Sequence, residues 1–152
     1  MRRFALLAAC LIGPVLPAFG QSCSVVSTPL SFPAYHAFSG HPSNATADVT
    51  VTCTGLLFVG ASYSVQLGGG QSGSIPSRKM RQASSGSELG YQVYTQSGQV
   101  WGNGVQGSTL QGSFLLGLLT RSRVHPISAT IPAGQQVNAG AYSDAVTMTV
   151  IW

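Results

Sequence analysis

The residue types that most often carry chemistry are few in this chain and lie far apart. Nucleophilic catalysis needs a Ser, Cys or Thr beside a base that a third group orients. The nucleophile motif GxSxG is absent, because Gly70-Gln71-Ser72-Gly73-Ser74 ends without its second flanking glycine. We therefore expect no enzyme, no metal site and no cofactor. The scattered candidates are His36, His41, His125, Asp48, Glu88 and Asp144.

Two glycine-rich stretches match the dinucleotide-binding fingerprint GxGxxG, at residues 68–73 and 102–107. The fingerprint binds a pyrophosphate only where a strand turns into a helix. The first stretch is followed by Ser-Ile-Pro-Ser and the second by Ser-Thr-Leu-Gln-Gly, and neither sequence begins a helix. Both stretches are predicted to be turns.

The N-terminus has the features of a secretory signal peptide. Arg2 and Arg3 precede an apolar run over residues 4–16 that is too short to span a bilayer, and small residues lie near Gly20. We predict a signal peptide over 1–20 and one exported, soluble domain over 21–152, with no membrane-spanning segment.

The cysteine count changes with this cleavage. Cys10 leaves with the signal peptide, so Cys23 and Cys53 remain. An even pair in an oxidising compartment predicts one disulfide. Closing a loop of about thirty residues should contribute roughly 3–4 kcal/mol to stability.

Charge is scarce, and it argues against nucleic acid as a partner. Arg2 and Arg3 supply two of the four net positive charges. Arg78, Lys79 and Arg81 form a small cluster without the further cations and aromatics of a nucleic-acid surface. We expect these three side chains on a solvated loop or strand edge.

Apolar and polar residues alternate along most of the chain, which is the pattern of half-buried strands. Glycine- and serine-rich clusters separate the strands, and no segment has a helical period, so we predict an all-β sandwich or barrel. Tyr142, near the start of the last strand, is a candidate for a hydroxyl bonded back to the backbone. The predicted inward-facing residues are Val49, Val51, Cys53, Tyr63, Val65, Leu67, Leu89, Tyr91, Val93, Ile127, Ala129 and Ile131.

Three apolar stretches remain to be placed. Val146, Met148, Val150 and Trp152 share one face of a C-terminal strand. Phe114–Leu119 is expected to be a strand buried on both faces. Leu56, Leu57, Phe58 and Val59 either extend the flanking strands into the core or form an exposed apolar contact loop.

An ordered set of short segments over residues 23–152 resembles the spore coat protein U domain. Subunits of archaic, Csu-type chaperone–usher pili share this domain. The segments include Cys23-Ser24-Val25, Leu30-Ser31-Phe32, Val51-Thr52-Cys53, Tyr63-Ser64-Val65-Gln66-Leu67, Leu89-Gly90-Tyr91-Gln92-Val93-Tyr94, Val100-Trp101-Gly102-Asn103-Gly104 and Gly140-Ala141-Tyr142-Ser143-Asp144.

The resemblance implies an incomplete immunoglobulin-like sandwich that lacks its last strand. Val146, Met148, Val150 and Trp152 would line or flank a hydrophobic groove beside the C-terminal strand. A periplasmic chaperone would fill the groove with a strand, and at the outer-membrane usher a neighbouring pilus subunit would replace it. The function implied is a structural subunit of a surface pilus that supports adhesion and biofilm formation.

In one respect the sequence departs from a repeating pilus subunit. A donor strand of about ten residues should precede the first cysteine, but only Gln21 and Ser22 separate Cys23 from the expected cleavage site. We therefore expect a terminal or tip position. The alternative is a self-complete secreted β-sandwich that acts as a binding or coat protein. The sequence leaves open whether a partner, an internal segment or a swapped second copy fills the groove.

Overall fold

The protein is described by a computed structural model that covers residues 21–55, 59–116 and 120–152, without the side chains of Val59, Ala61 and Leu116. Over these residues the chain is made of strands, with one short 3-10 turn. The elements are β1 (Ser22–Ser27), β2 (Ser43–Thr54), β3 (Val59–Leu67), η1 (Gly70–Ser72), β4 (Arg78–Arg81), β5 (Glu88–Tyr94), β6 (Leu110–Leu116), β7 (Arg121–Ile131) and β8 (Met148–Ile151).

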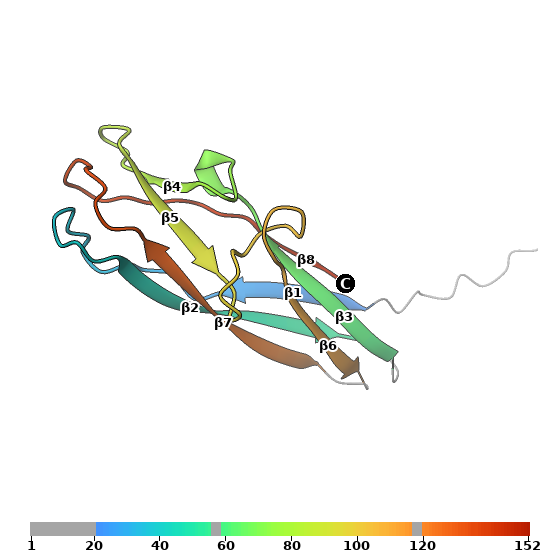
Figure 1. Ribbon diagram of the computed structural model, residues 1–152. Coiled ribbons are helices and arrows are strands. Elements are labelled where there is room, and N and C mark those ends of the chain that lie inside the picture. The colour runs from blue at the N-terminus through green and yellow to red at the C-terminus, as the bar shows by residue number, and fades with distance from the viewer. Residues whose placement is uncertain (1–20, 56–58, 117–119) are drawn as a thin grey trace, which may run out of the picture.

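The strands form two sheets that pack as a sandwich (Figure 1). One sheet has five strands in the order β1-β2-β7-β5-β4, and the other has three in the order β6-β3-β8. All the pairings between these strands are antiparallel. The predicted all-β, immunoglobulin-like sandwich is therefore confirmed.

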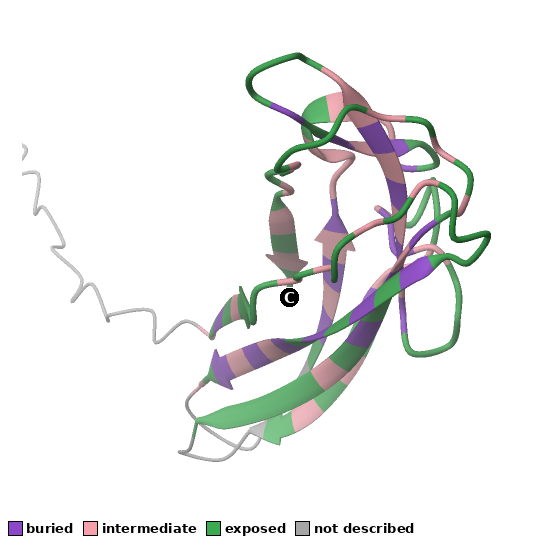
Figure 2. Ribbon diagram, turned by 90° about the vertical axis from the view of Figure 1, so that its left-hand side faces the viewer, coloured by how far each residue is buried: buried purple, intermediate pink, exposed green. Residues whose placement is uncertain are grey.

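The core lies between the sheets and follows the alternation in the sequence. Buried residues alternate with intermediate or exposed ones along β2, β5 and the second half of β7 (Figure 2). Each of the twelve residues predicted to face inward is buried, and Val49, Val51, Cys53, Val65 and Ala129 have no exposed surface. Both glycine-rich stretches with the dinucleotide fingerprint are turns, as predicted.

Two covalent or polar ties predicted from the sequence are also confirmed. Cys23 and Cys53 face each other across the β1–β2 pair and form a disulfide. The Tyr142 hydroxyl donates a hydrogen bond of 2.7 Å to the Asn138 carbonyl.

Residues 114–116 are the end of β6, so the strand predicted at Phe114–Leu119 is confirmed there, but its predicted burial on both faces was wrong. β6 belongs to one layer of a two-sheet sandwich, so only one of its faces meets the core. Phe114 is half-buried and packs against Tyr63, whereas Leu115 points outward and is 85% exposed. Residues 117–119 lie outside the described residues.

A histidine–tyrosine contact joins the two sheets. The Tyr63 hydroxyl on β3 lies 2.7 Å from Nε2 of His125 on β7, and the rings meet edge to face. Burial lowers the pKa of His125, and the positive charge of Arg123 lowers it further. The imidazole is therefore neutral in the folded protein over a wider pH range than in the unfolded chain.

This contact predicts a loss of stability in mild acid. Because the unfolded chain takes up a proton on His125 near its ordinary pKa of 6.5, and the folded protein only at lower pH, the free energy of unfolding should fall between pH 7.5 and 5.5. Urea unfolding at several pH values measures this slope. His125→Gln should flatten the slope, whereas the exposed loop variant His36→Gln should keep it. An unchanged slope in His125→Gln would refute the assignment.

Candidate functional site

An apolar groove runs between two segments from opposite ends of the chain. One wall is formed by Ser27–Phe32, which continues from β1, and the other by Tyr142–Met148, which leads into β8. Between these walls is a cavity of about 310 Å³. A second cavity of about 350 Å³ adjoins it, with Leu30, Phe32 and Tyr142 among the residues that line both.

The floor of the groove is the hydrophobic core itself. Trp101 is part of this floor and is 1% exposed, with its indole N–H donating to the Val65 carbonyl at 2.9 Å. The cavity thus borders core side chains that expose little of their own surface. The other floor residues, all buried, are Leu67, Met80, Tyr91, Val93 and Ile127.

The wall formed by the C-terminal segment pairs with each sheet in turn. Ser143 exchanges two backbone hydrogen bonds with Arg81 of the five-stranded sheet, of 2.9 and 3.2 Å. The Gly68 N–H then bonds to the Thr147 carbonyl, and β8 pairs with β3. In the described part of the chain β8 has no second partner strand, so one edge of its backbone is unpaired.

The four residues predicted to line or flank the groove lie in different places. Val146 and Met148 line the cavity and are half-buried. Val150 is half-buried and packs against the core beyond the cavity. Trp152 is 52% exposed, and its indole N–H donates to the Gln21 carbonyl at 3.2 Å. This bond ties the end of β8 to the start of β1.

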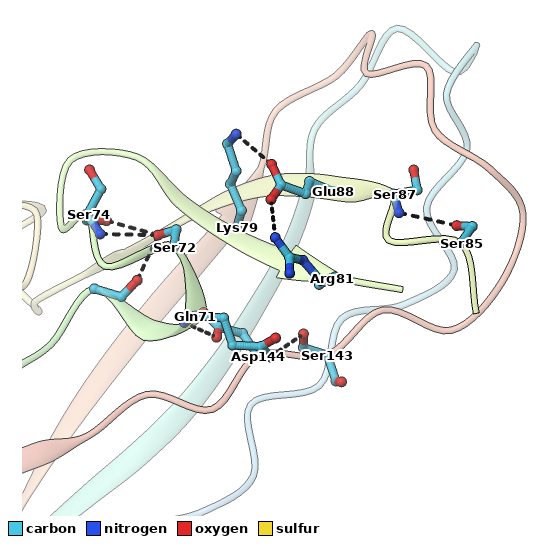
Figure 3. Close-up of polar contacts among 11 residues, drawn as sticks. Gln71, Ser72, Ser74, Lys79, Arg81, Ser85, Ser87, Glu88, Ser143 and Asp144 are labelled. Carbon is cyan, nitrogen blue, oxygen red and sulfur yellow. Dashed lines mark hydrogen bonds and ion pairs between the residues drawn. The ribbon is translucent and has the colours of Figure 1, made fainter. Parts of the chain in front are cut away.

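A carboxylate anchors the polar end of the groove. Asp144 accepts 2.7 Å hydrogen bonds from the Gln71 N–H and from the Tyr91 hydroxyl. Burial raises the pKa of Tyr91, and the bond to Asp144 raises it further. Figure 3 shows Asp144 and Ser143 beside Gln71, so the 70–72 turn holds the C-terminal wall in place.

The comparisons with known proteins identify the domain. A family model described as the Spore Coat Protein U domain matches residues 11–149. The chain belongs to this family. The comparison with curated proteins found none that matches this chain.

The comparison with solved structures found two matches to report, of which the first shows a similar fold. One is the crystal structure of the CsuC–CsuE chaperone–tip adhesion subunit pre-assembly complex from archaic chaperone–usher Csu pili of Acinetobacter baumannii. The match has 21% identity and a TM-score of 0.60, and it covers 87% of this chain and 40% of that chain. The other is a chaperone–tip adhesin complex of CFA/I fimbriae, with 14% identity, a TM-score of 0.48 and coverage of 81% and 37%.

Arg78 was expected on a solvated edge, and for this residue the prediction was wrong. Its side chain is 1% exposed, and burial lowers its pKa. The guanidinium donates to the carbonyls of Leu67, Gly68 and Trp101 and to the Gln92 side chain. Arg78 thus fixes the end of β3 on which the C-terminal wall pairs.

Its two neighbours in the cluster behave as predicted. On the edge strand β4, Lys79 is half-buried and Arg81 is exposed, and both pair with Glu88, at 2.6 and 2.9 Å (Figure 3). Arg78 differs because successive side chains of a strand point to opposite faces, and Arg78 lies on the inward face. There its guanidinium donates hydrogen bonds to main-chain carbonyls.

Two sequence predictions fall outside the described residues. They are the expected signal peptide and the apolar contact loop, with Leu56, Leu57, Phe58 and the side chain of Val59. The wall formed by residues 27–32 was not predicted as part of the site, although Leu30 and Phe32 alternate as a groove-facing segment would. Within the described residues no helix is long and apolar enough to cross a membrane, and no three metal-ligating side chains come together.

The role of Arg78 predicts a large effect of its removal. Arg78→Met keeps an unbranched apolar stem but removes the guanidinium that donates to three carbonyls, so the free energy of unfolding should fall by roughly 3 kcal/mol or more. Arg81→Met is the matched control on the same strand and should cost under about 1 kcal/mol, as exposed ion pairs do. Urea unfolding measures both values. Equal losses would contradict the structural role of Arg78.

Proposed function

We propose that this protein is a structural subunit of a surface pilus, assembled by the chaperone–usher route, and that its groove accepts a β-strand from another chain. The observation that carries the proposal is the unpaired edge of β8 beside an apolar groove floored by the core. An added strand would bond to that edge through its backbone and would cover the core with alternate side chains.

The partners follow from this chemistry. An exposed edge with apolar side chains is an aggregation hazard before assembly, so the subunit needs a strand-donating chaperone during export. We propose a periplasmic chaperone, an outer-membrane usher and a neighbouring subunit as successive partners, and the cell surface as the final location. We propose a structural role rather than a catalytic one, because the groove is lined mainly by apolar side chains and the Asp144 carboxylate is engaged by Gln71 and Tyr91.

We also propose a terminal position in the pilus, with surface attachment and biofilm formation as the role. β1 begins at Ser22, and all six of its residues pair with β2. With the proposed signal peptide cleaved after Gly20, only Gln21 would precede this strand, so the exported chain could accept a strand but would have none to donate.

One observation favours a self-complete secreted β-sandwich as the second candidate. Leu30 and Phe32 already pack against the core at the groove, and Trp152 bonds across its end to Gln21. If these contacts suffice to close the sandwich, the protein would act as a stand-alone binding or coat protein.

Export with and without a Csu-type chaperone separates the two candidates. We expect the protein to be recovered from the periplasm only as a complex with the chaperone. Met148→Asp, which places a charge in the groove, should abolish co-purification, whereas Thr149→Asp on the exposed face of the same strand should leave it intact. A soluble monomer that melts cooperatively without a partner would support the self-complete sandwich instead.

The terminal position has its own test. Complexes of this subunit and the chaperone, incubated with usher but without any other subunit, should yield no polymer of this chain, because it supplies no donor strand. Gel electrophoresis without boiling detects such polymers as a ladder. A ladder formed by this chain alone would overturn the terminal position and leave the strand-accepting groove unaffected.

A further inference from the structure

One wall of the groove is anchored at its two ends and not in between. At one end the Thr28 N–H donates to the Asp48 carbonyl at 2.9 Å. At the other end the Tyr35 hydroxyl donates to the Pro132 carbonyl at 3.2 Å and accepts from the Gln135 N–H at 2.8 Å. The six residues between these anchors, 29–34, are called the strap below.

The strap makes no backbone hydrogen bond to any described residue. Pro29 and Pro33 have no N–H, so two of its six residues could not donate to a neighbouring strand in any case. Four strap residues are exposed, and only Leu30 and Phe32 are half-buried. Such a segment opens at low free-energy cost, because few contacts are lost when it moves.

The space beside the strap is incompletely filled. Leu30 and Phe32 line both groove cavities, of about 310 and 350 Å³, and the second cavity runs along the whole strap except Pro29. The Phe32 ring meets the Tyr91 ring edge to face at 6.2 Å. The first cavity is lined by Phe32 on this wall and by Val146 and Met148 on the opposite wall.

The opposite wall is held much more firmly. It is bonded to Arg81, to Gly68 and, through Asp144, to the 70–72 turn. The groove therefore has one fixed wall with an unpaired backbone edge and one loosely held wall that offers two apolar side chains. An incoming strand would bond to the fixed wall, and the loose wall would adjust to it.

We propose that residues 29–34 are a strap that closes on a strand bound in the groove, and that Leu30 and Phe32 then contact the apolar side chains of that strand. The occupant is an extended segment of another chain with alternating apolar residues. This inference rests on the proposed function, since it concerns how the same groove holds its strand.

Hydrogen exchange measured by mass spectrometry tests the strap on the mature protein. The probe is a donor peptide of five Val-Thr repeats with a lysine at each end, and the control peptide has five Val followed by five Thr. Without peptide, the amides of Leu30, Ser31, Phe32 and Ala34 should exchange as fast as those of the exposed turn 96–98. With the donor peptide, exchange should slow at least tenfold both in the strap and in Val146–Ile151.

The outcomes separate this inference from the proposed function. Slower exchange in 146–151 alone would mean that the strand binds and the strap does not close, which overturns the inference. No slowing in either segment with either peptide would count against strand acceptance itself. Slow exchange in the strap before any peptide is added would also overturn the inference, because the wall would then be rigid.

A side-chain variant gives a second measurement. Phe32→Ala should weaken binding of the donor peptide by about tenfold or more, since it removes an apolar ring from the contact. Phe38→Ala, in the same connection between β1 and β2 but 92% exposed, should leave binding unchanged. Equal affinities for the two variants would show that the strap takes no part in binding.

Discussion

Among the described residues, the backbone of the C-terminal strand has a hydrogen-bonded partner strand along one edge only, and the candidate site depends on this constraint. β8 pairs with β3, and within the described residues nothing pairs with its other edge. Backbone polar groups that leave water need partners, so this edge must stay solvated or receive a strand. Because the groove beside it is floored by Trp101, Val93 and Ile127, the same added strand would also cover apolar surface.

The sequence predicts well those features that depend on one strand at a time. Alternation identified the buried residues of β2, β3, β5 and β7 because each of these strands has one face on the core. Features that depend on how the sheets are layered were harder to predict. Leu115 has the same apolar character as a core residue and is exposed because it lies on the outer face of the three-stranded sheet, which a run of apolar residues does not reveal.

The site was half predicted for a similar reason. Val146 and Met148 belong to a clear alternating strand, whereas Leu30 and Phe32 lie between two prolines in a segment without strand pairing. Arg78 was missed because a positive charge is ordinarily read as solvent-exposed. Its position between Ser77 and Lys79 on a short strand gives no signal that three main-chain carbonyls converge on it.

The fixed wall of the groove joins the two sheets, and this gives strand binding a structural consequence. Ser143 pairs with Arg81 in the five-stranded sheet, and four residues later Thr147 bonds to Gly68 at the end of β3. Arg78, on β4 of the five-stranded sheet, donates hydrogen bonds to the carbonyls of Leu67 and Gly68 at the end of β3. Its side chain therefore also links the two sheets. A strand that lies along this wall would therefore pack on residues of both sheets at once. Its binding would stabilise the packing between the sheets as well as the edge of β8. A groove at this position, rather than on an outer face, therefore suits the strand-accepting subunit proposed above.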